Sequence, residues 1–117
     1  MMQFSVEFYE TSSDQCPVRD FLNDLRDSAP DDFVAVMAGL AKLRNRLYHR
    51  APLSKSVGND LFELRHVGKL NTRVLYFFMK GRRIVAVHGI RHKGRKIPAR
   101  DRKTALDRKN DWLSRYE

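Results

Sequence analysis

LFELRHVGKLNTRVLYFFMKGRRIVAVHGIR, residues 61–91, contains three strand-like runs separated by short links. The runs cover 61–66, 72–79 and 84–91, and they are rich in β-branched and aromatic residues or alternate apolar with polar positions. The links VGKLN and KGRR are short, and Gly81 supplies the backbone freedom that a tight turn requires. This stretch predicts a meander of two hairpins, and it decides the fold.

The part of the chain before this stretch predicts a strand followed by two helices. Residues 3–9 alternate apolar with polar side chains, which indicates a strand. Pro17 suits the first position of a helix that ends before Ser28. A second helix begins at Asp31-Asp32 and ends near Tyr48-His49, with an apolar stripe of Phe33, Val36, Met37, Leu40, Leu43 and Leu47.

Two further segments complete the expected fold. Residues 51–60 hold Pro52, Gly58 and two serines, which is typical of a loop, and Pro98 opens a final helix that runs to about Arg115. The order is therefore β-α-α-β-β-β-α. We expect an α+β fold of one domain over residues 1–117, in which an antiparallel sheet carries the two N-terminal helices on one face and the C-terminal helix on the other.

Composition limits the class of protein and of partner. Cys16 is the single cysteine, so no internal disulfide can form. The longest strictly apolar run, 74–79, is far shorter than the ~20 residues of a membrane span, and the N-terminus lacks a secretory pattern, so we expect a soluble cytoplasmic protein. The net charge of +9 divides into −2 for residues 1–60 and +11 for residues 61–117, which favours a polyanionic or acidic partner.

The first hairpin has a predictable register. If its loop is centred on Lys69, Leu64 lies opposite Val74 and Phe62 opposite Tyr76, a suitable apolar set for the helix-covered face. Tyr76 then belongs to the core of the sheet.

The same register places Arg65 opposite Arg73 on the other face, where like charges destabilise a sheet. An anion between them would relieve the repulsion, and a guanidinium group matches the geometry of phosphate. Two alternatives stay open: Glu63 neutralises part of the pair, or a slip of one residue moves one arginine to the other face.

The basic stretch HGIRHKGRKIPARDRKT, residues 88–104, follows the last strand and has seven Lys/Arg in its last fourteen positions against one acid. Antiparallel pairing returns the end of that strand toward Arg73. We therefore expect a catalytic set of Arg65, Arg73, His92, Lys93 and Lys96, with Arg91, Arg95, Arg100 and Lys103 binding RNA.

This set suits the cleavage of RNA without a metal or another cofactor. In-line attack by a ribose 2′-OH requires that its proton be removed, that the leaving oxygen be protonated and that cations stabilise the charge of the transition state. Lysine or histidine can transfer protons, whereas arginine only stabilises charge. His88 and His92, four residues apart on a strand, lie roughly 13 Å apart, which is too far to share a metal ion.

The runs LFELR, NTRVLYFF, GRRIVAVHGI and KGRKIPARDRKTAL resemble the RelE/ParE superfamily of type II toxin–antitoxin toxins. The resemblance is strongest to HigB-like toxins of the phage-derived branch. It implies a microbial-ribonuclease-like fold and an mRNA endoribonuclease that acts on the ribosome and inhibits translation. It also implies neutralisation by a cognate antitoxin, with operator DNA bound only through the toxin–antitoxin complex and with no membrane partner.

Carried over to this sequence, the resemblance supports Arg65, Arg73, Lys93 and Lys96 as site residues. His92 stands where many relatives have a lysine, and this leaves open which group acts as base or acid. A ParE-like toxin that inhibits DNA gyrase and cuts nothing is the alternative from another class, and a nucleic-acid-binding accessory protein is the third.

Overall fold

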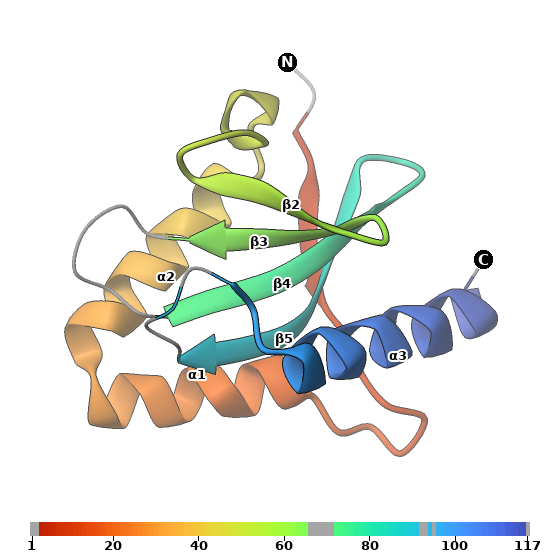
Figure 1. Ribbon diagram of the computed structural model, residues 1–117, viewed down its shortest axis with the longest axis horizontal. Coiled ribbons are helices and arrows are strands. Elements are labelled where there is room, and N and C mark those ends of the chain that lie inside the picture. The colour runs from red at the N-terminus through yellow and green to blue at the C-terminus, as the bar shows by residue number, and fades with distance from the viewer. Residues whose placement is uncertain (1–2, 66–71, 92–93, 95, 117) are drawn as a thin grey trace.

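The computed structural model describes residues 3–65, 72–91, 94 and 96–116 (Figure 1). Its elements are β1 (Ser5–Phe8), α1 (Pro17–Ser28), α2 (Pro30–Lys42), the short 3-10 helix η1 (Arg46–Tyr48), β2 (Ser54–Gly58), β3 (Leu61–Arg65), β4 (Thr72–Met79), β5 (Arg83–Arg91) and α3 (Ala99–Tyr116). The five strands form one sheet in the order β1-β5-β4-β3-β2. Within the described ranges, no helix is both long and apolar enough to cross a membrane.

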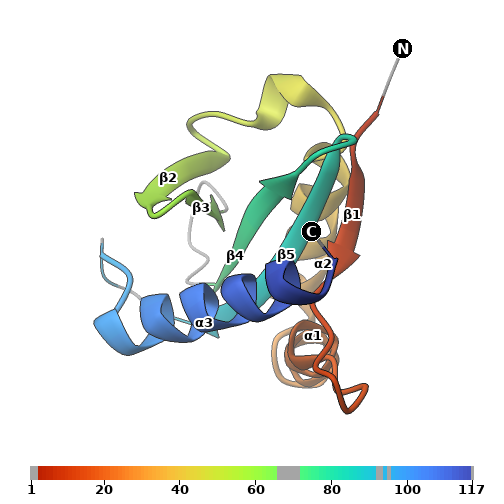
Figure 2. The same cartoon turned by 90° about the vertical axis from the view of Figure 1, so that its right-hand side faces the viewer.

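Helices cover both faces of the sheet, as the sequence predicts. Alternation along β4 sends Val74 and Tyr76 into a core shared with α1 and α2, and Leu75 and Phe77 into a second core shared with α3. Figure 2 shows α3 crossing in front of β4 and β5, and α2 lying behind these strands. The α+β class and the placement of the helices are therefore confirmed.

The register of the first hairpin is confirmed as well. Phe62 pairs with Tyr76, Leu64 with Val74 and Arg65 with Arg73. Tyr76 is fully buried and its hydroxyl hydrogen-bonds to the hydroxyl of Ser54, so it belongs to the core. A slip of one residue would move Arg73 or Glu63 to the face that packs against α1 and α2, so burial on that face fixes the register.

The prediction of a loop over 51–60 is wrong for half of that segment. Residues 54–58 form β2, an edge strand antiparallel to β3, joined to it by a turn in which Gly58, Asn59 and Asp60 have positive φ angles of 91°, 56° and 57°. The segment SKSVG has few β-formers, and only its pairing with the free edge of β3 makes it a strand. Pattern-based prediction misses such strands because tertiary contacts decide them.

The expectation of a wholly antiparallel sheet is also wrong. β1 pairs with β5 in parallel, with Val6 beside Ile84 and Phe8 beside Ala86. Alternation in a strand determines which residues share a face, but it does not determine the direction of the neighbouring strand. The sheet is mixed.

The second helix ends earlier than predicted. It stops at Lys42, and the side chain of Asn45 accepts a hydrogen bond from the backbone N–H of Leu47 at the start of η1. Leu47 and Met37, both assigned to the buried stripe, are 65% and 40% exposed. An apolar residue at helical spacing therefore does not establish burial, and these two side chains lie on an uncovered surface.

Candidate nucleic-acid interface

The predicted arginine pair lies on the face of the sheet that carries α3. Arg65 ends β3 and Arg73 follows Thr72 at the start of β4, and the two are direct cross-strand partners. Arg65 is exposed, whereas the Arg73 side chain is only 11% exposed. Two guanidinium groups are thus held on adjacent strands, one in solvent and one largely buried.

Glu63 is the counter-charge of the buried arginine. Its carboxylate is 2% exposed, and its Oε1 lies 3.5 Å from Arg73 Nε. Among the described residues, neither Glu63 Oε1 nor Arg73 Nη1 has a hydrogen-bond partner. Glu63 therefore offsets one of the two positive charges, and the charge of Arg65 is left for solvent or a ligand.

Charged groups form a row across this face. Lys55 on β2 pairs with Glu63 on β3, Glu63 pairs with Leu75 on β4, and Leu75 pairs with His88 on β5. The next row holds Arg65 and Arg73. The face is therefore polar at the β2–β3 side, while the apolar core beneath α3 continues from Leu75 onward.

His88 joins β5 to the start of α3. Its Nε2 lies 2.8 Å from Asp101 Oδ1, and Arg108 Nη1 donates to its Nδ1 at 3.1 Å and to the carbonyl of Val87 at 2.8 Å. Because Nδ1 accepts from a guanidinium that cannot lose its proton, the network assigns the ring proton to Nε2, which donates to Asp101. Burial lowers the pKa of Arg108 from its usual value.

Further cations lie just before α3 and along its first turns. Lys96 and Arg100 are exposed, and Arg102 Nη1 reaches within 3.7 Å of the position that a Cβ would take on Gly58, at the end of β2. Lys103 forms an exposed ion pair with Asp107 at 2.9 Å. Arg102 therefore lies beside the end of β2, whereas Lys96 and Arg100 are exposed cations before and at the start of α3.

The other predicted residues do not all join this group. Arg91 forms an ion pair with Asp32 at 3.6 Å, and Asp32 also accepts a hydrogen bond from Thr72, which ties Arg91 to the start of α2. Arg91 would have to give up this ion pair, or share it, in order to bind RNA as predicted. His92, Lys93 and Arg95 lie outside the described residues.

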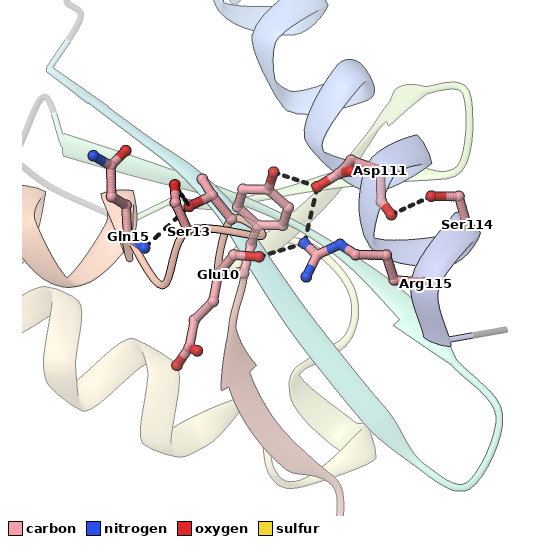
Figure 3. A network of polar contacts seen from close by, with 8 residues as sticks. Glu10, Ser13, Gln15, Asp111, Ser114 and Arg115 are labelled. Atoms are coloured by element: carbon pink, nitrogen blue, oxygen red, sulfur yellow. Dashed lines mark hydrogen bonds and ion pairs between the residues drawn. The ribbon is translucent and has the colours of Figure 1, made fainter.

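The far end of α3 is fixed by a second polar network (Figure 3). Asp111 accepts hydrogen bonds from the Tyr9 hydroxyl at 2.6 Å and from Arg115 at 2.9 Å, and Arg115 also donates to the carbonyl of Glu10. The hydrogen bond from Tyr9, and to a smaller extent that from Arg115, lowers the pKa of Asp111. Burial, and to a smaller extent the hydrogen bond to Asp111, raises the pKa of Tyr9. Both ends of α3 are therefore held by polar contacts to other elements.

This arrangement is suited to holding and stabilising a phosphodiester. Arg65 and Arg73 can contact non-bridging oxygens, since a guanidinium presents donors in a fork that matches phosphate. Lys96 is an exposed ammonium group that can both bind and transfer a proton.

Sequence reasoning missed two features of this face. The sequence indicated Glu63 as a neutralising group, but not that it is buried or that it pairs with Arg73, because both depend on packing. His88 and Asp101 were not connected, although Asp101 is the only acid among the cations of 91–104 and was the available signal.

Comparison with known proteins identifies one family. The profile of the family described as phage derived protein Gp49-like (DUF891) matches residues 20–110, which is more than half of the chain. The matched range includes both arginines, Glu63 and the start of α3. No curated protein matches the sequence.

Proposed function

Since the chain belongs to the Gp49-like family of phage-derived proteins, a family of RelE/HigB-like toxins, we propose that it is the toxin of a type II toxin–antitoxin system. In this proposal the protein is a metal-independent endoribonuclease that cleaves mRNA on the ribosome and thereby inhibits translation. Its partners are mRNA, the ribosome and a cognate antitoxin.

The observation that carries the proposal is the pairing of Arg65 with Arg73 over a single carboxylate. Two cations on adjacent strands with one counter-charge leave net positive charge where an anion would lower the energy of the folded protein. An RNA phosphate supplies that anion, and charge that develops on it during in-line attack strengthens the interaction in the transition state.

The remaining groups have assigned roles in the proposal. Arg73, oriented by Glu63, stabilises the phosphorane-like transition state, and Arg65 contacts the same phosphate from the exposed side. Lys96, with His92 or Lys93, supplies the proton transfers. The His88–Asp101 contact is a positioning device, because it fixes the start of α3 and with it the segment that carries Lys96.

Two exposed side chains give the cleanest test. Arg65→Ala and Lys96→Ala remove charges in solvent, so the fold should persist, whereas Arg73→Ala also leaves Glu63 buried without its partner. Each exposed variant should relieve growth arrest and abolish mRNA cleavage on ribosomes while keeping the circular dichroism spectrum of the parent. If both folded variants arrest growth like the parent, the assigned site is wrong.

Transcript mapping separates this function from gyrase inhibition. Cuts in phase with codons after induction support the nuclease, whereas intact transcripts with defects in DNA supercoiling support a ParE-like toxin.

A further inference from the structure

A second surface, on the outer side of α2, is apolar and uncovered within the described residues. Val34, Met37, Ala38 and Ala41 recur on α2 at i, i+3, i+4 and i+7, which places them on one side of the helix. All four are exposed, with Val34 65% and Met37 40% accessible. Apolar residues at helical spacing normally face a core, so this stripe, on the side of α2 away from the sheet, lacks a cover within the described chain.

The stripe continues beyond the end of α2. Leu47 and Tyr48 in η1 are 65% and 39% exposed, and together with Lys42, Arg50 and Pro52 they line a pocket of about 290 Å³. The α2 docking surface is defined here as Val34, Met37, Ala38, Ala41, Leu47 and Tyr48. A pocket next to an apolar stripe provides the place for one large anchoring side chain of a partner.

The charge around the C-terminal end of this surface has one sign. Residues 33–59 contain five Lys/Arg and no Asp/Glu. Four of these cations lie at the end of α2 and along the segment that follows: Lys42, Arg44, Arg46 and Arg50. Lys42 Nζ lies 5.7 Å from the centroid of the Tyr48 ring, so the basic and apolar parts of the surface adjoin.

We infer that the α2 docking surface binds an acidic amphipathic helix presented by a protein partner. Apolar side chains of that helix would cover the stripe and fill the pocket, and its carboxylates would face the four cations. A symmetric dimer through this surface fits poorly, because the four cations of one copy would face the four of the other, and Asp31 is the one exposed acid of α2 to offset them. Nucleic acid fits poorly as well, since Val34, Met37 and Leu47 offer nothing to a phosphate backbone.

The inference rests on the proposed function only where it names the antitoxin as that partner. Ala38 and Lys42 line a small pocket together with Arg65, but Leu47 and Arg50 do not, so substitutions at Leu47 and Arg50 should leave RNA cleavage intact. The two activities can therefore be separated by mutation, and this separation is the basis of the test.

The experiment uses the purified full chain and the antitoxin that the proposed function expects to be encoded beside it, called the neighbour below. The test variant is Leu47→Ser/Arg50→Glu, which changes two exposed side chains of the pocket, and the control is Arg19→Glu on the exposed side of α1. We expect the dissociation constant, measured by calorimetry, to rise at least tenfold for the double variant and to change less than twofold for the control. In cells, the double variant should arrest growth but escape rescue by the co-expressed neighbour.

The outcomes are distinguishable. Equal affinity of the parent and the double variant for the neighbour overturns the docking surface and leaves the proposed function standing. If the neighbour binds neither protein and the parent does not arrest growth, the proposed function fails. Two other results would also overturn the inference. If the parent sediments as a dimer and the double variant does not, the surface binds a second copy of the chain. If the double variant alone binds a single-stranded RNA oligonucleotide more weakly, the surface binds RNA.

Discussion

The buried pair of Glu63 and Arg73 should show strong energetic coupling. We consider Glu63→Gln and Arg73→Met, which remove one charge each and keep most of the side-chain volume. At the observed 3.5 Å, and with an effective dielectric constant of about 20, two unit charges attract by about 5 kcal/mol before desolvation is subtracted. Removal of one partner from a buried pair costs about 3–5 kcal/mol.

The lower end of that range applies here, because the contact is not a hydrogen bond and because Arg73 keeps 11% exposure. Each single variant should lose about 3 kcal/mol of unfolding free energy, and the double variant should lose about 2 kcal/mol less than the sum of the singles. Urea unfolding of the four proteins at pH 7, followed by far-ultraviolet circular dichroism, measures both quantities.

A surface pair provides the control for this cycle. Arg83 and Glu7 form a closer ion pair, at 2.6 Å, but their side chains are 34% and 31% exposed. Their coupling, from Glu7→Gln and Arg83→Met, should therefore be about 1 kcal/mol or less. Additive effects of Glu63→Gln and Arg73→Met, within about 0.5 kcal/mol, would refute the reasoning that the carboxylate is the counter-charge of Arg73.

Three further predictions concern other parts of the fold. Gly89→Ala should destabilise by about 2–3 kcal/mol in urea unfolding, because a Cβ at Gly89 would lie 2.3 Å from a ring carbon of Phe21; wild-type stability would show that the ring moves aside freely. The hydrogen bond from Arg83 lowers the pKa of Glu7 below 4.5, so ionised Glu7 stabilises the fold above pH 4.5 and this stabilisation is lost as the pH falls. The difference in unfolding free energy between the parent and Glu7→Gln should therefore shrink from pH 6 to pH 3. Asp101→Asn should lower kcat for mRNA cleavage on ribosomes with little change in KM and in RNA affinity; an unchanged kcat would remove the positioning role of its contact with His88.

The sequence alone predicted the central hairpin and the helical layers, because local rules govern them. Alternation in 61–66 and 72–79, with a loop symmetric about Lys69, was sufficient to place Arg65 opposite Arg73. Pro17 placed the start of α1 at the correct residue. In these cases the pattern of burial and the preferences of single residues point to the same answer.

The remainder of the fold depends on contacts between distant segments. β2 is a polar edge strand that forms only against β3. The parallel pairing of β1 with β5 produces no recognisable pattern in the sequence of either strand. The end of α2 was misplaced because the exposed stripe that continues into Leu47 has the same periodicity as a buried one. A surface that binds a partner and a face that packs in a core cannot be distinguished by spacing alone.

The same limit holds for the candidate site. We placed the arginine and lysine residues from the register of the strands. The ion pair of Arg91 with Asp32 and the contact of His88 with Asp101 each join two different elements, and the sequence pattern of a single element does not predict such contacts. A residue assigned to a ligand by charge alone can already be engaged within the fold.

The most direct test of the proposed function is a map of transcript 5′ ends after induction of the parent protein and of Arg65→Ala. We expect cuts in phase with codons across translated messages for the parent, and their absence for the folded Arg65→Ala variant. Intact transcripts in cells that the parent protein has arrested would contradict the proposed function.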